Sequence, residues 1–283
     1  MEDGFSLEDS TVAICGLGLM GGSLALGLRG HCRTLIGFDP DPAALELARR
    51  QKVVDVADPD PAKHIHAADL VVLAAPVRAI LDLLDQLPSY MPNPCIVIDL
   101  GSTKQWIVAA MSRLPERFDP IGGHPLCGSE RLSLANAEQS LYREAPFLLT
   151  PLGRTTPRAL SAARQVIEAV GAKAIVLGDA EHDRVLASTS HLPFLLSSAL
   201  ALATPPEVSG FIGPGYKSTA RLAGTPSSMM LGVLESNREN ILRAVHGLQG
   251  KLAEIESTLA APDFSRLESL LSEAEDKYRA LLQ

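Results

Sequence analysis

The chain has 283 residues, of which 46% are hydrophobic and 4% aromatic, so it can bury a full core filled mainly by aliphatic side chains. Its formal net charge of -8 disfavours a nucleic-acid partner, because surfaces that bind nucleic acids are basic. The four cysteines lie far apart with no CxxC pair, which predicts free thiols in a reducing compartment, and we expect no bound metal. The acidic opening of the chain lacks an apolar run, so we expect no signal peptide and a cytoplasmic protein.

The first half of the chain alternates short β-branched runs with helical patterns. Strands are predicted at 11–15, 34–38, 70–73, 95–99, 118–123, 146–150 and 172–177. Helices are predicted at 42–51, 77–87 and about 156–169. This alternation is typical of an α/β fold, so we expect a Rossmann-type, doubly wound, mostly parallel sheet covered on both faces.

The sequence changes character after Gly178 and reads as almost entirely helical from there on. We therefore predict a dinucleotide-binding domain over 1–178 and a helical substrate and dimerisation domain over 179–283. Residues 186–203 carry no Asp, Glu, Lys or Arg and are about long enough to span a membrane. Their four serines, threonine, histidine and proline favour a helix buried in protein, and we expect no membrane span.

Two further segments of the second half have local signals. Proline and glycine punctuate 204–218, which is therefore predicted to be a loop that could shape a pocket. The closing segment from residue 264 has one apolar helical stripe, and Ser265 with Glu268 fits a capping box at its start.

A glycine pattern after the first predicted strand indicates a dinucleotide site. Gly16, Gly18 and Gly21 have the G-x-G-x-x-G spacing, in which the glycines allow a tight turn, backbone approach to a pyrophosphate and close helix packing. Asp39 ends the next strand, where its carboxylate would bond the ribose hydroxyls and repel a 2′-phosphate, so NAD is favoured over NADP. Alternatively, Asp39 only caps the following helix. The residues assigned to the cofactor are Gly16, Gly18, Met20, Gly21, Asp39, Ala75 and Pro76.

A second group of polar residues is expected at the same edge of the sheet. Ser102 and His124 each follow a predicted strand, and ligands bind beyond the carboxyl ends of parallel strands. His191 and Arg221 belong to the helical half. A helical domain that closes over this edge could bring Arg221 onto a substrate.

The chain resembles the prephenate/arogenate dehydrogenase family of tyrosine biosynthesis. The resemblance rests on five segments in order, GLGLMGGSLA, DLGSTK, GGHPLCGSE, HDRVLASTSHLPF and STARLAG, within residues 12 to about 245. It implies an NAD-dependent oxidative decarboxylation of prephenate, a cyclohexadienol carboxylate, to 4-hydroxyphenylpyruvate, by a homodimer. Arogenate, which would give tyrosine directly, stays open as the substrate.

The resemblance also implies a role for each site residue. His124 accepts the hydroxyl proton as general base, and Ser102 bonds that hydroxyl or orients the imidazole. Arg221 clamps a substrate carboxylate, and His191 and Glu130 line or tune the site. Simpler roles are a helix cap for Ser102, a surface ion pair for Arg221 and a buried core position for His191.

Two positions depart from the common pattern of the family. Phe194 stands where many relatives have a second histidine, and Met230 where many have a tryptophan. Both are expected near the substrate side chain, and the loss of an imidazole there could shift preference from prephenate toward arogenate.

Two other functions compete with this interpretation. A reductase of the 6-phosphogluconate-dehydrogenase type shares the GLGLMG stretch but uses a lysine and lacks the GGHPLCG segment. A non-catalytic NAD(H) sensor would need only the glycine loop and Asp39, so Ser102, His124 and Arg221 speak against it.

Overall fold

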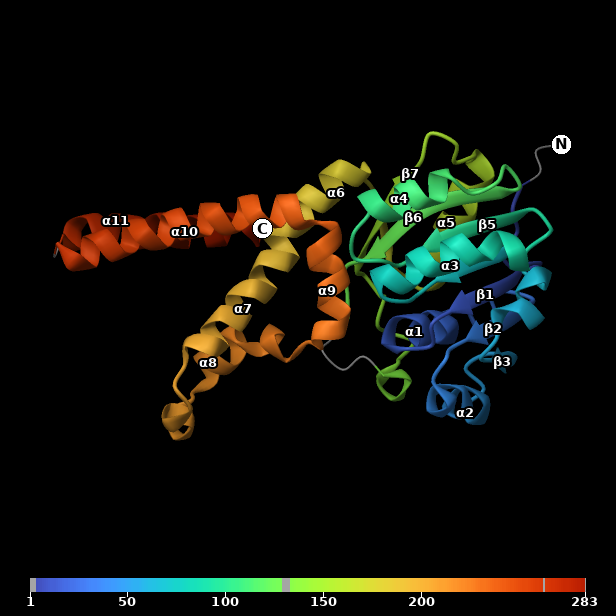
Figure 1. The fold of residues 1–283 in the computed structure, drawn as a ribbon, viewed down its shortest axis with the longest axis horizontal. Coiled ribbons are helices and arrows are strands. Elements are labelled where there is room, and N and C mark those ends of the chain that lie inside the picture. Colours follow the sequence, from blue (N-terminus) through green and yellow to red (C-terminus); the bar gives the residue numbers. More distant parts are fainter. Residues whose placement is uncertain (1–3, 129–132, 262, 283) are drawn as a thin grey trace. The chain divides into compact units, whose positions relative to one another are not determined.

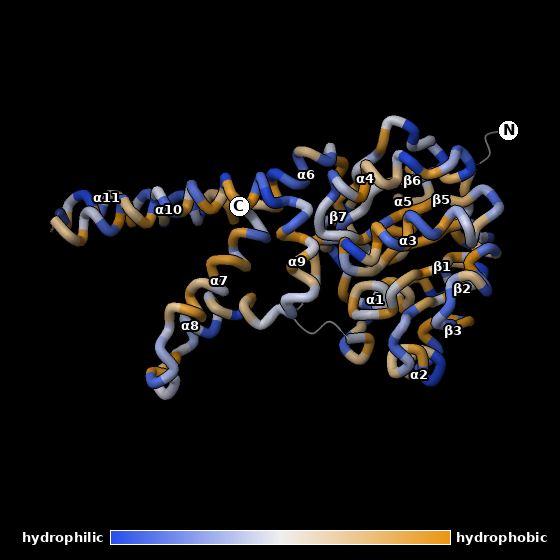
Figure 2. The backbone as a smooth tube through the Cα atoms, viewed as in Figure 1, coloured by the Kyte–Doolittle hydropathy of each residue, from blue (hydrophilic) through white to orange (hydrophobic). Residues whose placement is uncertain are grey.

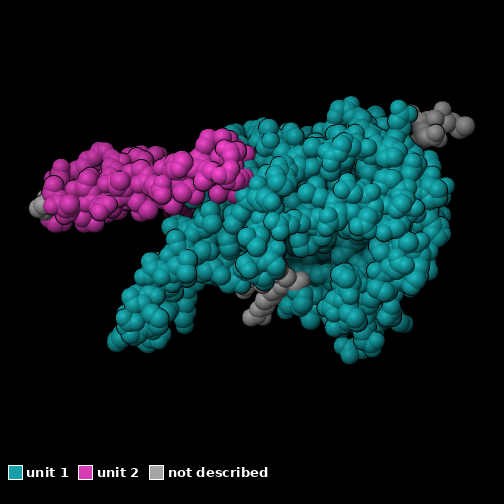
Figure 3. All heavy atoms as spheres, viewed as in Figure 1, with its two compact units in different colours: residues 1–237 teal, residues 238–283 magenta. Residues whose placement is uncertain are grey.

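The computed structural model describes residues 4–128, 133–261 and 263–282. They fall into two compact units, residues up to Asn237 and residues from Arg238 onward, which Figure 3 colours separately. The domain boundary near residue 178 stays a prediction, since this division by compactness groups the helices over 179–237 with the sheet.

The first unit is built on one eight-stranded sheet (Figure 1). Its strands are β1 (Thr11–Cys15), β2 (Thr34–Phe38), β3 (Val56–Asp58), β4 (Leu70–Leu73), β5 (Cys95–Asp99), β6 (Phe118–Pro125), β7 (Pro146–Pro151) and β8 (Lys173–Val176). They are ordered β3-β2-β1-β4-β5-β6-β7-β8, and every neighbouring pair is parallel except β6 with β7. The doubly wound, mostly parallel sheet is confirmed.

Helices cover both faces of this sheet. They are α1 (Leu19–Leu28), α2 (Pro42–Arg50), α3 (Val77–Tyr90), α4 (Gln105–Ser112) and α5 (Pro157–Ala169). Residues of α1, α2 and α5 pack with Val12 and Ile14 of β1 in one buried cluster. Residues of α3 and α4 pack with the alternate positions Ala13 and Cys15 in another. Because side chains alternate along a strand, the fully buried β1 can contribute to both clusters.

The structure corrects one strand boundary at the candidate site. β6 does not end at Gly123 but continues through Pro125, so His124 lies inside a strand and not beyond it. The physical reason is the antiparallel partner β7, whose register pairs His124 with Leu148 and Pro125 with Phe147. Ser102, in contrast, does follow the end of β5, as predicted.

Short 3₁₀-helices lie between the strands at Pro61–Lys63, Ile65–Ala67 and Leu134–Asn136, and from Asp179 onward the first unit is helical. The helical segments from Asp179 onward are α6 (Asp179–Leu186), a π-helix (Ala187–His191), α7 (Leu192–Ala203), a 3₁₀-helix (Pro206–Phe211), α8 (Pro214–Thr219), another 3₁₀-helix (Arg221–Gly224) and α9 (Ser227–Ser236). The change to helix after Gly178 is therefore confirmed, whereas much of the predicted loop over 204–218 forms short helical turns.

The stretch from Asp179 to Ala203 is continuously helical. In the described part of the chain it is the one helix long and apolar enough to cross a membrane by length and composition, a test that core helices of soluble proteins also pass. Only 22% of its most apolar window is buried within this chain, although burial in protein was expected. Figure 2 shows the hydrophobic colouring of α7.

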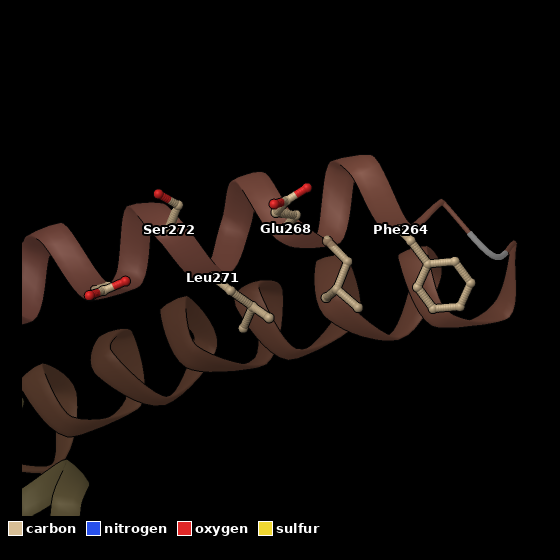
Figure 4. Close-up of a pocket in the computed structure, with 6 residues that line it drawn as sticks. Phe264, Glu268, Leu271 and Ser272 are labelled. Atoms are coloured by element: carbon tan, nitrogen blue, oxygen red, sulfur yellow. The ribbon is translucent and has the colours of Figure 1, made fainter.

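The second unit consists of α10 (Arg238–Ala260) and α11 (Phe264–Leu281), which contact each other. The predicted capping box is wrong, because Asp263 caps α11 by accepting a hydrogen bond from the Arg266 backbone N–H at 2.9 Å. Figure 4 shows a shallow groove whose lining residues all belong to α11, among them Phe264 and Leu271. None of them is a predicted site residue.

Candidate active site

The turn between β1 and α1 leaves room only for glycine at two of the predicted positions. Gly16 has a φ of +103°, and a Cβ atom there would lie 2.3 Å from the Ala74 carbonyl oxygen. A Cβ atom on Gly21 would lie 1.9 Å from the Gly16 carbonyl oxygen. The N-cap of α1 is Gly18, and no side chain among the described residues caps this helix. The first N–H groups of α1 and the positive end of its dipole are therefore available to an anion. This cradle fits the pyrophosphate of a dinucleotide.

Asp39 braces the glycine turn from the end of β2. Its Oδ2 accepts a hydrogen bond from the Leu17 N–H at 2.7 Å, and its Oδ1 accepts one from the Asp41 N–H at 2.9 Å. The cap of α2 is Asp41, which accepts from the Ala43 N–H at 2.9 Å, so Asp39 is not the helix cap. A carboxylate at this position remains partly exposed, as a ribose ligand has to be.

The remaining predicted cofactor residues surround the same turn. Ala75 lies against it, since its backbone nitrogen would be 3.4 Å from a Cβ atom on Gly16. Pro76 directly precedes α3, and Met20 lies in the first turn of α1, where its carbonyl accepts a hydrogen bond from the Tyr142 hydroxyl at 2.8 Å.

A buried histidine pair lies where β6 meets α6. His124 is only 9% exposed, and its Nδ1 lies 2.9 Å from Nε2 of His182. The other nitrogen of His182, Nδ1, lies 2.8 Å from Oδ1 of Asp183. The Asp183 carboxylate also accepts the backbone N–H groups of Lys104 at 2.7 Å and Gln105 at 3.0 Å, at the start of α4. Asp183, His182 and His124 thus form one continuous hydrogen-bonded chain.

A buried ion pair joins the end of β5 to the residue that precedes α4. The Lys104 ammonium contacts the Asp99 carboxylate, and both side chains are fully buried. Asp99 also accepts the Gly101 N–H at 2.8 Å and the Gly123 N–H at 3.0 Å. Burial lowers the pKa of Lys104, and the Asp99 charge opposes that shift.

His191 lies at the end of the π-helix and is almost fully buried. Its Nδ1 lies 3.1 Å from Nδ2 of Asn237, which also donates a hydrogen bond to the Asp183 carbonyl at 2.6 Å. Its Nε2 is buried without a hydrogen-bond partner among the described residues. Burial lowers the pKa of His191 to about 4, while the Asp183 charge and, to a smaller extent, the Ser102 backbone oppose the shift.

The electrostatics of the site keep His124 unprotonated at neutral pH. Burial lowers its pKa well below the ordinary value of an imidazole, and the neighbouring His182, Lys104 and His191 act in the same direction. A neutral imidazole can accept a proton, which is what a general base must do.

The structure brings most of the predicted site residues to one edge of the sheet, with two qualifications. Arg221 is exposed and begins the 3₁₀-helix that packs against α7. Glu130 lies outside the described residues. Sequence reasoning missed His182, Asp183 and the Lys104–Asp99 pair. His182 and Asp183 are adjacent polar residues in the sequence, but their partners lie far away along it. His124 is 58 residues from His182, and Lys104 is 79 residues from Asp183.

Three features of the site are typical of a dinucleotide-dependent dehydrogenase. They are the glycine cradle on the parallel sheet, the carboxylate at the end of β2 and the buried neutral imidazole on β6. Family models described as the nucleotide-binding and dimerization domains of prephenate dehydrogenase match residues 24–176 and 179–273. The chain therefore belongs to the prephenate dehydrogenase family, and it is an NAD-dependent oxidoreductase.

Individual relatives agree with this assignment. The chain is 29% identical to the prephenate dehydrogenase of Bacillus subtilis over 82% of its own length and 65%, just under two thirds, of that protein. A prephenate dehydrogenase from A. aeolicus, solved with hydroxyphenyl propionate and NAD⁺, matches with a TM-score of 0.89 and 29% identity over 98% of this chain and 100% of that one. Synechocystis arogenate dehydrogenase matches with a TM-score of 0.78 and 29% identity over 95% and 99%.

Proposed function

We propose that this chain catalyses the NAD-dependent oxidative decarboxylation of prephenate to 4-hydroxyphenylpyruvate in tyrosine biosynthesis. The observation that carries the proposal is the buried, unprotonated His124 at the same sheet edge as the glycine cradle. When bound, NAD supplies the acceptor for the hydride on the ring carbon that carries the hydroxyl. The family assignment disfavours a lysine-dependent reductase and a non-catalytic sensor.

The side chains of the site then divide the remaining work. His124 accepts the proton of the ring hydroxyl, and Ser102 donates a hydrogen bond that holds the hydroxyl oxygen or the imidazole in place. Nε2 of His191, which has no hydrogen-bond partner among the described residues, is proposed to bind a polar group of the substrate. Arg221 pairs with a substrate carboxylate, for which its planar fork is suited, and the proposed part of Glu130 is to line or tune the site.

Arogenate is the second candidate substrate, and two residues favour considering it. Phe194 packs against the buried cluster under α3, and Met230 is buried in the same cluster. Neither side chain can supply the hydrogen bond that an imidazole or indole N–H could give to the substrate side chain at these two positions. The likeness to the Synechocystis arogenate dehydrogenase supports the same alternative.

The direct test is a steady-state assay that follows NADH formation with prephenate and with arogenate, each with NAD and with NADP. We expect turnover of prephenate with NAD, and the ratio of kcat/KM for the two substrates identifies the preferred one. Absence of turnover with both substrates would overturn the proposal.

Replacing Asp39 by serine is expected to lower the NAD preference. The change removes the charge that would repel a 2′-phosphate, and it also removes two hydrogen bonds that brace the glycine turn. Hydrogen bonds to a charged group contribute about 1.5–3 kcal/mol, so we expect kcat/KM with NAD to fall by about ten- to a hundredfold, and the value with NADP to fall less or to rise. An unchanged NAD/NADP ratio would mean that Asp39 only supports the turn. Asp41→Ser is the matched control, because it removes a neighbouring charge and keeps an oxygen that can cap α2.

We also propose that the enzyme is a cytoplasmic homodimer whose helical region over 179–283 forms the interface. The family model for residues 179–273 is described as a dimerization domain, and α7, α10 and α11 each expose leucines, including Leu202, Leu252 and Leu271. A stable interface of this kind is isologous and buries more than about 2,000 Å². Light scattering at micromolar concentration should give twice the 30.1 kDa mass of one chain, and a monomer mass would contradict the dimer.

A further inference from the structure

The hydrogen-bonded chain that ends at His124 has a fixed direction. Asp183 is the starting point, because its carboxylate already accepts the backbone N–H groups of Lys104 and Gln105 and so acts only as an acceptor. The imidazole of His182 must therefore donate its Nδ1 proton to Asp183 across 2.8 Å. A neutral His182 that donates from Nδ1 has an unprotonated Nε2.

The same reasoning carries one step further, to His124. Its Nδ1 lies 2.9 Å from the unprotonated Nε2 of His182, so Nδ1 of His124 must carry the proton and donate it. A neutral His124 with a proton on Nδ1 has its lone pair on Nε2. The proton needed for the chemistry can then be taken up at only one atom.

We propose that His182 and Asp183 are positioning residues that fix the tautomer of His124, so that Nε2 is always the nitrogen that accepts the substrate proton. This inference rests on the proposed role of His124 as general base. The three residues come from β6 and α6, and α4 holds Asp183 through two backbone N–H groups. The position of α6 therefore determines which nitrogen of His124 accepts the proton.

The groups around His124 favour a neutral imidazole. The titratable and charged groups facing His124 are His182 of α6, Lys104 before α4 and His191 of the π-helix; Asp99 is paired with Lys104, and Asp183 with His182. All three groups that face the ring act with burial to lower the pKa of His124. Asp183 acts oppositely on His182, whose pKa burial nevertheless lowers.

The wild-type enzyme itself provides the first test. Two-bond ¹H–¹⁵N correlation spectra of histidine-labelled protein distinguish a protonated from an unprotonated ring nitrogen, and His124→Asn assigns the signals. We expect His124 to be protonated at Nδ1 and unprotonated at Nε2 at neutral pH. The opposite tautomer, or an equal mixture, overturns the proposal. No substrate is needed, so this outcome is separate from failure of the proposed reaction.

Two variants of His182 then separate positioning from mere packing. In His182→Gln the amide oxygen can take the place of Nε2 and accept the proton of His124 Nδ1, whereas His182→Phe cannot accept it. We expect kcat to fall by about 10- to 100-fold in the phenylalanine variant, which is part of the roughly 10²–10⁴-fold that a general base contributes. In the glutamine variant we expect kcat to fall severalfold at most. The KM for NAD should be unchanged in both.

The pH profile and the spectra complete the test. His182 is one of the groups that lower the pKa of His124, so its removal should raise that pKa. Because a general base works only above its pKa, the acid limb of the pH profile of kcat should move to higher pH in both variants. Only His182→Phe should show a mixture of His124 tautomers. Equal losses of kcat in the two variants with an unchanged tautomer in each would show that His182 only packs against the sheet.

Discussion

Replacing His124 by asparagine is expected to lower kcat by about 10²–10⁴-fold, the range that a general base typically contributes. The asparagine amide can still donate a hydrogen bond toward His182, so the buried site keeps a polar partner while it loses the atom that takes up the proton. His124 lies on β6, beyond β4 and β5 from the glycine turn after β1, so the affinity for NAD should stay within about threefold.

Two measurements check this expectation. Steady-state kinetics gives kcat with prephenate and with arogenate, and quenching of protein fluorescence by NAD(H) gives the cofactor affinity without any turnover. Turnover within about threefold of wild type would remove His124 from the mechanism. A loss of NAD binding comparable to the loss of kcat would instead mean that the substitution disturbs the whole edge of the sheet.

Replacing Lys104 by methionine should have the largest effect on stability. The change leaves the Asp99 carboxylate buried with two backbone N–H donors but without its counter-ion. Removing one partner of a buried ion pair typically costs about 3–5 kcal/mol, because the remaining charge has lost both water and its partner. The free energy of unfolding, measured in urea, should fall by that amount.

A matched control is available on the surface. Lys63 pairs with Asp58 at 3.1 Å, but its side chain is 55% exposed, so Lys63→Met should leave the free energy of unfolding nearly unchanged. Equal effects of the two lysine substitutions would show that the Lys104–Asp99 pair contributes no more than a solvated one.

The sequence predicted the parts of the fold that local patterns determine. The strands from β1 to β8 were found except β3, a three-residue edge strand too short to have a pattern of its own. α4 was anticipated only through the alternative role of Ser102 as a helix cap, whereas the helix begins at Gln105 with Lys104 at its N-cap position. The true cap of α11 was overlooked because Asp263 and Ser265 are both good capping residues two positions apart, and only the structure shows which of them accepts the backbone N–H.

The candidate site was predictable to a different degree. The glycine turn and Ser102 follow from strand ends and spacing, which are local, whereas His124 was singled out from its Gly/Pro-rich segment although the strand end expected before it was wrong. The contacts that give His124 its chemistry are not local: His182 and Asp183 reach it from α6, and no pattern in the sequence joins them to β6 or to α4. The extension of β6 past Gly123 depends likewise on pairing with β7.

The π-helix between α6 and α7 has a consequence for how these helices can vary. An α-helix turns by about 100° per residue, so His182 and His191, nine positions apart, would point to nearly opposite sides of an uninterrupted α-helix. The backbone N–H of Leu192 bonds instead to the Ala187 carbonyl, five residues back, so one turn absorbs an additional residue. That turn changes the direction in which the His191 side chain points from the helix. His191 contacts Asn237, which also donates a hydrogen bond to the Asp183 carbonyl. Loss of a single residue between Ala187 and Ser190 would restore a regular helix and swing His191 away, so this short segment should tolerate substitutions far better than changes of length.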